Sequence, residues 1–275
     1  MADKKYKLTS EKLEWEGHVL YRIKALKDFA DIKAGDLGGW IQSESNLSQK
    51  DNCWIYDEAK VYASAKVIDS AQVADAAEVS GTALVSNYAI VNKNAKIDDN
   101  VMLQGFCLVT GCASLYNDVI VKDKAVVSDN AHISGNVKLL GYALVKDDAY
   151  VGNSSVISGY SYIGNSARIM NYARIHDSSI LDFAWICGHA TVTDKSKIRG
   201  TAQVFDSAIV THSIVEDYAK VFGKAKIHGN VLVTGTAEIG GSTDVDSGIF
   251  EEGIYTNNAS IELFRISSNV TFKEI

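Results

Sequence analysis

Histidines are the side chains in this sequence best suited to move protons, because their pKa lies near neutral pH. The six histidines are His18, His132, His176, His189, His212 and His228. No catalytic residue is assigned from spacing alone, and His176, His189 and His228 are kept as alternatives for a general base. No cofactor and no metal are expected from these residues.

The cysteines and the charge balance indicate the setting in which the chain works. Cys53, Cys107, Cys112 and Cys187 form no Cys-x-x-Cys pair, which indicates free thiols in a reducing compartment. The net charge of −7 argues against direct binding of nucleic acid or of an anionic membrane. No apolar run is long enough for a signal peptide or a membrane span. We therefore expect a cytoplasmic protein.

A six-residue repeat runs through most of the chain and must position these side chains. From Val61 to Leu181 every sixth residue is aliphatic, and the residue two places earlier is usually small. The period slips by one residue between Leu181 and Ile186, and again between Val210 and Val215. Counted from Ile55 to Val245 there are 33 such hexads, and the apolar spacing of an α-helix is absent.

The residue two places after each aliphatic predicts how the chain turns. From Ala63 to Asp177 this position is Gly, Asn or Asp in 18 of 20 cases, with Ala63 and Lys93 as the exceptions. These three residue types adopt positive φ at the least cost. The pattern predicts an all-β fold, a single-stranded left-handed parallel β-helix. Three hexads make one triangular coil, which gives about 11 coils.

The two ends lack the hexad and are expected to cover exposed strand edges. Residues 1–50 form the predicted N-terminal cap, with a hairpin around Glu16 and Gly17. Residues 51–248 form the β-helix. Residues 249–275 form a tail that caps the second end or pairs with another subunit.

Two features of the sequence resemble known families. The hexad resembles that of the hexapeptide-repeat superfamily, which is best known for acyltransferases. The segment from Tyr21 to Ser48, with Asp-Leu-Gly-Gly-Trp at positions 36–40, resembles the N-terminal signature of a transferase-like family of phages, prophages and bacteria. The resemblance covers essentially the whole chain and implies the β-helix fold.

The first resemblance implies an acyl-CoA-dependent acetyl- or acyltransferase, with acetyl-CoA as the donor and a histidine as the general base. The extruded loop that such enzymes use is absent from the coils between 55 and 181. His176 and His228 lie nine hexads apart, which places them on one face at roughly 14 Å, too far for one metal ion. Lys197, Lys220 and Lys226 fall on three different faces, so no phosphate-binding patch is expected.

An aromatic column stands out on the predicted surface. Steps of 18 residues place along one edge Tyr88, Phe106, Tyr142 and Tyr160, with Lys124 between the two pairs. Cross-strand aromatic pairs stabilise a sheet by a few tenths to about 1 kcal/mol, and aromatic residues are also enriched where partners bind. These four residues, together with Trp185 beside the first slip, are the predicted partner-binding residues.

Two hypotheses for the function remain. The first is a non-enzymatic interaction protein that binds a protein partner or a second copy of itself. The second resemblance implies that such a protein is phage- or prophage-encoded and works in the host cytoplasm, with inhibition of a host defence complex as one form. The alternative is the acyltransferase. The sequence leans away from an enzyme because the loop and the basic patch are missing.

Overall fold

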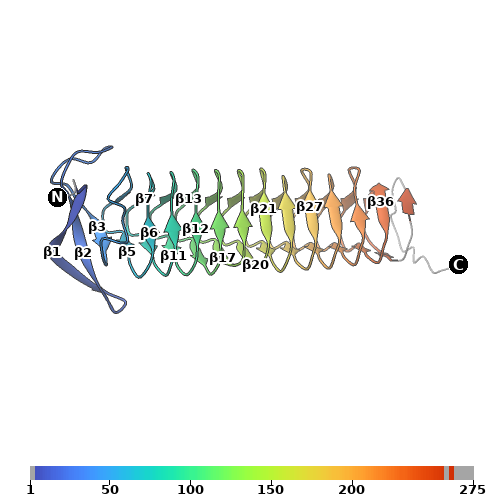
Figure 1. Cartoon of the computed structure of the whole chain (residues 1–275). Coiled ribbons are helices and arrows are strands. Elements are labelled where there is room, and N and C mark those ends of the chain that lie inside the picture. Colours follow the sequence, from blue (N-terminus) through green and yellow to red (C-terminus); the bar gives the residue numbers. More distant parts are fainter. Residues whose placement is uncertain (1–3, 257–259, 263–275) are drawn as a thin grey trace. The chain divides into compact units, whose positions relative to one another are not determined.

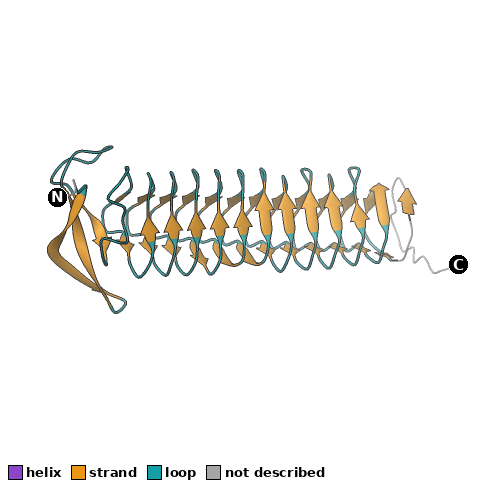
Figure 2. Ribbon diagram, viewed as in Figure 1, coloured by secondary structure: helices purple, strands orange, loops and turns teal. Residues whose placement is uncertain are grey.

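The computed structural model describes residues 4–256 and 260–262, within two compact units, Met1–Asn136 and Val137–Ile275. Strands are the only regular elements among these residues, and short loops join them (Figure 2). Each unit is a left-handed parallel β-helix whose coils have three short strands, as the hexad predicts. No described segment is a helix long and apolar enough to cross a membrane.

An antiparallel hairpin precedes the coils of the first unit. β1 (Tyr6–Trp15) and β2 (His18–Ala25) pair around a two-residue turn at 16–17, as predicted. β3 (Leu37–Ile41) pairs antiparallel with β2 and parallel with β5 (Lys60–Val61), so it connects the hairpin to the first coil (Figure 1). The division into a cap at 1–50, a β-helix at 51–248 and a tail at 249–275 stays a prediction.

Three parallel stacks of strands, named sheets A, B and C, form the coils of the first unit. Sheet A holds β5, β8 (Glu78–Val79), β11 (Lys96–Ile97), β14 (Ser114–Tyr116) and β17 (His132–Gly135). Sheet B holds β6 (Lys66–Val67), β9 (Leu84–Val85), β12 (Met102–Leu103) and β15 (Ile120–Val121). Sheet C holds β4 (Trp54–Ile55), β7 (Gln72–Val73), β10 (Ile90–Val91), β13 (Leu108–Val109) and β16 (Val126–Val127). In Figure 1, β11 and β17 mark sheet A, β6 and β12 sheet B, and β7 and β13 sheet C.

The second unit has three corresponding stacks, named sheets D, E and F. Sheet D holds β20 (Tyr150–Asn153), β23 (Arg168–Ile169), β26 (Trp185–Ile186), β29 (Gln203–Val204), β32 (Lys220–Val221), β35 (Glu238–Ile239) and β38 (Ile254–Tyr255). Sheet E holds β18 (Lys138–Leu139), β21 (Val156–Ser158), β24 (Arg174–His176), β27 (Thr191–Thr193), β30 (Ile209–Thr211), β33 (Lys226–Ile227), β36 (Asp244–Ser247) and β39 (Ser260–Glu262). Sheet F holds β19 (Leu144–Val145), β22 (Tyr162–Ile163), β25 (Ser179–Ile180), β28 (Lys197–Ile198), β31 (Ile214–Val215), β34 (Leu232–Val233) and β37 (Ile249–Phe250).

The repeat residues occupy the positions that the hexad predicts. The aliphatic and small side chains, such as Val61 and Ala59, point inward and are fully buried. The predicted corner residues have positive φ, including the two exceptions, Ala63 at 53° and Lys93 at 58°. Burial of apolar surface inside every coil is therefore the main stabilising contribution to both units.

The first slip lies one strand earlier than the sequence predicts. Ile180, and not Leu181, is the buried residue, so the five-residue step runs from Ile175 to Ile180, and the predicted slip between Leu181 and Ile186 is wrong. The buried Ser178 explains the shorter step, because its hydroxyl donates to the carbonyl oxygen of His176 at 2.9 Å. The second slip, from Val210 to Val215, lies where it was predicted.

The first residues of the predicted tail continue the sheets of the second unit. Phe250 and Tyr255 are buried, and each follows the preceding inward residue by a five-residue step. Strands β37, β38 and β39 pair with β34, β35 and β36 of the same chain. The predicted strand around Val270 and Phe272 lies outside the described residues.

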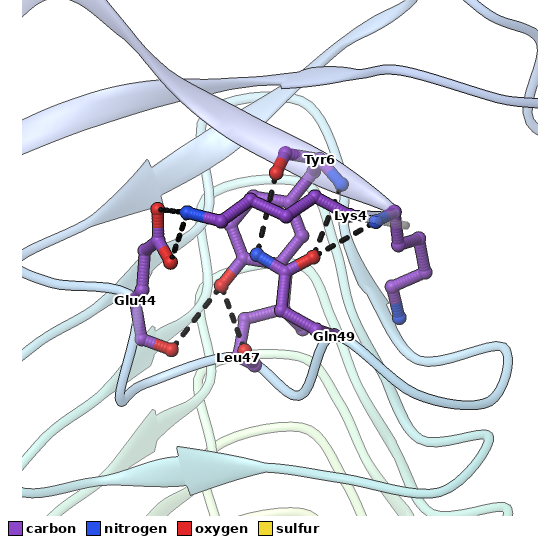
Figure 3. Close-up of polar contacts among 6 residues, drawn as sticks. Lys4, Tyr6, Glu44, Leu47 and Gln49 are labelled. Atoms are coloured by element: carbon purple, nitrogen blue, oxygen red, sulfur yellow. Dashed lines mark hydrogen bonds and ion pairs between the residues drawn. The ribbon is translucent and has the colours of Figure 1, made fainter. Parts of the chain in front are cut away.

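Polar contacts hold the start of the chain against the loop that follows β3 (Figure 3). The Lys4 ammonium group pairs with the Glu44 carboxylate at 2.7 Å. The Tyr6 hydroxyl donates to the carbonyl oxygen of Leu47 at 2.7 Å, and the Gln49 side chain bonds to both the backbone N–H and the carbonyl of Tyr6. These contacts fix the hairpin at the beginning of the first unit.

The two glycines of the Asp-Leu-Gly-Gly-Trp segment permit close packing of β3 on the first coil. A Cβ atom on Gly39 would lie 2.5 Å from the carbonyl oxygen of Ala59, closer than atoms can approach without a shift. The adjacent Trp40 donates from Nε1 to Glu58 at 2.9 Å, and Arg22 pairs with the other carboxylate oxygen at 2.7 Å. The segment that carried the family resemblance thus joins the hairpin to the β-helix.

We expect Gly39→Ala to lower the free energy of unfolding by about 1–3 kcal/mol, because the added methyl group must displace the backbone of the first coil. Urea denaturation followed by tryptophan fluorescence measures this change. Leu37→Ala is the matched control, since this side chain of the same strand is 53% exposed and its loss should change stability by less than about 0.5 kcal/mol. Equal midpoints for Gly39→Ala and the wild type would contradict the packing role.

Candidate functional site

The four aromatic residues of the predicted column form two stacked pairs, one in each unit. Tyr88 and Phe106 lie at the sheet B to sheet C corner, with ring centroids 4.8 Å apart and planes 2° from parallel. Tyr142 and Tyr160 lie at the sheet E to sheet F corner, with centroids 4.6 Å apart and planes at 6°. All four side chains are exposed, Tyr160 to 72%. Their role in partner binding stays a prediction.

Trp185 belongs to a different face from the stacked tyrosines. It lies in sheet D between Arg168 and Gln203, and its side chain is 41% exposed. Together with Phe183 and Met170 these residues line a shallow open depression. The structure therefore does not place Trp185 with the aromatic column.

The three candidate histidines lie in three separate environments. The ring of His189 stacks on Tyr172 at 4.8 Å. His228 lies 2.7 Å from the Asp244 carboxylate. His176 lies three strands away from His228 in sheet E, as the hexad count predicts, so the two do not meet. No group of three His, Cys, Asp or Glu side chains suited to a metal ion occurs among the described residues.

His176 is the candidate histidine that has both a hydroxyl group and a carboxylate within reach. The Ser158 Oγ atom lies 2.9 Å from His176 Nδ1, because Ser158 and His176 are register partners in strands β21 and β24. The Asp177 Oδ2 atom lies 3.2 Å from His176 Nε2. His176 is exposed and Ser158 half-buried, so both are accessible from solvent. We name Ser158, His176 and Asp177 the serine site.

The five-residue corner turns the Asp177 carboxylate toward this site. Asp177 Oδ1 accepts the backbone N–H of Tyr160, one coil earlier, at 2.7 Å. At a six-residue corner such as Asp182, the carboxylate accepts instead from the following coil, here from Gly200 N–H at 3.0 Å. Gly159 makes room for Asp177, because a Cβ atom there would lie 2.1 Å from Asp177 Oδ1.

This arrangement supports proton transfer between an oxygen atom and the imidazole. When the Nε2 proton points at Asp177, the Nδ1 lone pair accepts the proton of the Ser158 hydroxyl. The Asp177 carboxylate, 3.2 Å from Nε2, then places a negative charge beside the imidazolium that the transfer would form. The same hydroxyl lies 3.5 Å from the carbonyl oxygen of Ile175, a longer contact that competes weakly.

A basic depression begins one coil further along the same corner. Its lining includes Lys195, Lys197, His212 and Asn230, and Lys195 N–H donates to the carbonyl oxygen of Asp177 at 2.7 Å. Neither lysine side chain forms an ion pair with a carboxylate of the described chain. Lys197, Lys220 and Lys226 lie in three different sheets, as expected. The hexad pattern did not predict that Lys195 and Lys197 line the same depression.

The largest pKa shifts lie in the first unit, away from the serine site. Burial raises the pKa of Cys107 to about 11, which keeps its thiol protonated at neutral pH. Burial, followed by a hydrogen bond to Glu16, raises the pKa of Tyr62 to about 12. Hydrogen bonds from Arg22 and Trp40 lower the pKa of the Glu58 carboxyl group. These shifts follow from packing of the cap and core and mark no second site of proton transfer.

The repeat pattern predicts His176, Tyr142 and Tyr160 as site residues but not Ser158, Asp177 or Lys195. The step of 18 residues that revealed the aromatic column also leads from Ser158 to His176. Applying that step to every polar residue would have found the pair. The carboxylate contact could not be found this way, because it depends on the direction in which the shorter corner turns Asp177.

The repeat, the parallel β-solenoid and the likeness to one curated protein fit a hexapeptide-repeat, transferase-like family. No family model matches the sequence. A stretch of 40 residues is 52% identical to the uncharacterized acetyltransferase YdcK of Escherichia coli (strain K12). The match covers 14% of this chain and 12% of the length of YdcK.

Proposed function

We propose that this chain is an acyltransferase that uses acetyl-CoA or a related acyl thioester as its donor. The observation that carries the proposal is the serine site, in which a histidine lies between a hydroxyl group and a carboxylate at 2.9 and 3.2 Å. The partial likeness to a protein named as an acetyltransferase supports it. Of the two hypotheses from the sequence, the alternative is thus the better supported.

His176 acts in this proposal as the general base that removes a proton during acyl transfer. Asp177 is a positioning residue in this proposal, because its carboxylate lies 3.2 Å from Nε2 while Nδ1 faces the Ser158 hydroxyl at 2.9 Å. The Tyr160 N–H bond to the other carboxylate oxygen keeps Asp177 in place.

The donor would lie along the corner between sheets E and F. Lys195, Lys197 and His212 supply positive charge and hydrogen-bond donors for its phosphate groups. The exposed faces of Tyr142 and Tyr160 offer stacking surface for a planar group such as the adenine ring.

His176→Ala should lower kcat of acetyl transfer by about 10²- to 10⁴-fold, because it removes the proposed general base. Release of free CoA thiol, measured with an acceptor library of amines and alcohols, gives the rate. His189→Ala and His228→Ala are the matched controls, since one histidine stacks on Tyr172 and the other pairs with Asp244. If His228→Ala abolished transfer while His176→Ala did not, the site would be misplaced.

Lys197→Ala should raise the Kd for acetyl-CoA about tenfold, because a charge-assisted hydrogen bond to a phosphate contributes about 1.5 kcal/mol. Isothermal titration calorimetry measures this constant. Lys220→Ala is the control, since that lysine lies in sheet D and pairs with Glu238 at 2.8 Å. An equal loss of affinity in both variants would indicate a general charge effect and contradict a phosphate site at this corner.

A second candidate function is protein interaction, which the exposed aromatic pairs favour. The four aromatic side chains have exposed fractions between 46% and 72%, and exposed apolar surface of this kind is typical of protein-binding sites. A partner protein or a second copy of the chain would bury them. A phage origin and a host defence target stay predictions of the sequence resemblance.

Under the interaction hypothesis, the double change Tyr88→Ser and Phe106→Ser should abolish self-association or partner binding, because it removes a complete aromatic pair. Sedimentation velocity measures self-association, and pull-down from host lysate with mass identification measures partner binding. The pair lies in the first unit, so acetyl transfer should remain unchanged. Unaltered assembly in this variant and in Tyr142→Ser with Tyr160→Ser would rule out the aromatic pairs as a binding surface.

A further inference from the structure

We propose that Lys5 and Cys53 form a site of reversible oxidative modification, at which hydrogen peroxide converts the pair into a covalent nitrogen–sulfur cross-link, a sulfenamide. The inference is independent of acyl transfer, because both residues lie in the first unit and the serine site lies in the second. It requires an amine and a thiol at reacting distance, an amine that can be uncharged, and surroundings that hold the two together.

The two reactive atoms lie in contact inside the protein. Lys5 Nζ is 3.3 Å from Cys53 Sγ, and the two residues are buried, with exposed fractions of 1% and 0%. Atoms held about 3–3.5 Å apart in a fixed orientation are in a near-attack arrangement, in which bond formation requires little further movement. The pair therefore meets the first requirement without a change of fold.

Backbone oxygens and an aromatic ring hold the Lys5 side chain in this position. The Nζ group donates to the carbonyl oxygens of Cys53 and Lys50 at 2.8 and 3.1 Å. It also donates to the carbonyl oxygen of Asp51 at 3.3 Å and lies 5.1 Å from the centre of the Phe29 ring. An uncharged amine has two N–H donors and one lone pair. It can therefore bond to two of these oxygens and direct its lone pair at the sulfur atom.

Burial favours the uncharged forms of both groups. It lowers the pKa of Lys5 and raises the pKa of Cys53, because neither an ammonium group nor a thiolate is well solvated there. A larger share of Lys5 is then the neutral amine, which is the form that attacks an electrophile. The second requirement is thus met by the same burial that holds the pair together.

The oxidant reaches the sulfur atom through the loop at 50–52, whose residues are exposed and whose carbonyl oxygens bond to Lys5. Local opening of such a loop costs less than unfolding of the coils. It admits hydrogen peroxide and hydrates the sulfur, which allows the reactive thiolate to form. We therefore expect Cys53 to be oxidised more slowly than the exposed Cys112.

The chemistry balances in two steps with hydrogen peroxide as the oxidant. The Cys53 sulfur bonds to one peroxide oxygen, the oxygen–oxygen bond breaks, and the departing hydroxide takes up a proton to form water. Sulfur loses two electrons, peroxide gains them, and the product is a sulfenic acid. Lys5 Nζ then bonds to Sγ, the sulfur–oxygen bond breaks, and the departing hydroxide takes a proton from the nitrogen and leaves as water.

A thiol reductant reverses the modification. Its sulfur bonds to Cys53 Sγ, the nitrogen–sulfur bond breaks, and the nitrogen takes up the thiol proton. A second thiol then releases Cys53 from the mixed disulfide. While it lasts, the cross-link joins residues 48 positions apart and ties the segment before β1 to the loop before β4. A closed loop restricts the unfolded chain, so the oxidised first unit should resist urea better than the reduced one.

The test uses the full chain with Cys112→Ser and Cys187→Ser, which removes the exposed and the half-buried thiol. The chain is treated with hydrogen peroxide, digested without reductant and analysed by peptide mass spectrometry. We expect a cross-linked pair of peptides that contain Lys5 and Cys53, lighter than the two separate peptides by two hydrogen atoms. Dithiothreitol should abolish the pair, and the urea midpoint should be higher before reduction than after it.

Two controls test the role of the amine. Lys5→Arg keeps N–H donors for the carbonyl oxygens, but its guanidinium group stays charged and does not attack sulfur. This variant should lose the cross-link, and dimedone should then label Cys53 as the sulfenic acid. Cys107 is the internal control, since it is equally buried and no lysine is among the described groups that shift its pKa. It should form no cross-link.

Several results would overturn the assignment. One is a treated chain in which Cys53 is found only as the thiol or the sulfinic acid while Lys5 is unmodified. Another is a cross-link that persists in Lys5→Arg, because the partner would then be a different residue. A cross-linked product that contains an additional oxygen atom would exclude the direct nitrogen–sulfur bond. Circular dichroism of each variant confirms that it retains the β-helix.

Discussion

Each coil is held to the next by backbone hydrogen bonds, and these bonds form only if the chain turns sharply at three corners per coil. The corners demand positive φ, which costs most residues about 1–2 kcal/mol. Ala63 and Lys93 adopt it nevertheless, at 53° and 58°, because the ladder on either side fixes their backbone. Aspartate and asparagine have a further advantage, since Asp69 and Asp99 each accept a backbone N–H of the following coil at 2.9 Å. The residues at the corners thus set both the handedness of the coils and the composition of the surface.

The serine site arises where this rule is interrupted. Here the step between inward aliphatic residues is five instead of six, so the corner Asp177 is followed directly by the buried Ser178. The Asp177 carboxylate therefore turns to the preceding coil. There it meets Tyr160 N–H and the imidazole of His176, instead of bonding forward as Asp182 does. Shortening one corner therefore changes a structural aspartate into one that can orient a histidine. The chemistry of the site follows from a local departure from the same ladder that holds the coils together.

The fold could be predicted from the sequence because every hexad repeats the same two features, an inward aliphatic residue and a corner residue that tolerates positive φ. The position of the slip could not, since Ile180 and Leu181 are both aliphatic and Ser178 and Ser179 are both small. The buried hydrogen bonds of Ser178, to the His176 carbonyl and from its own N–H to Ser161 Oγ, decide the register. Hydrophobic periodicity does not record such bonds.

The candidate site was harder to predict because it joins residues of two coils and depends on the direction of side chains. Tyr142, Tyr160 and His176 were named from separate patterns, and no pattern connected them. The contrast between the two aromatic pairs shows what the sequence alone left open. Beside Tyr88 and Phe106, the nearby Ser86 is buried and bonds to a backbone carbonyl at 3.2 Å.

Beside Tyr142 and Tyr160, Ser158, which lies two residues before Tyr160, is accessible and bonds to an imidazole at 2.9 Å. A binding surface would use both aromatic pairs alike, because their stacking and exposure are similar. Chemistry would use only the second pair, because within the described chain it is this pair that adjoins a histidine with both a hydroxyl group and a carboxylate within reach. The surroundings of the two aromatic pairs, and not the presence of the pairs, therefore distinguish the acyltransferase hypothesis from the interaction hypothesis.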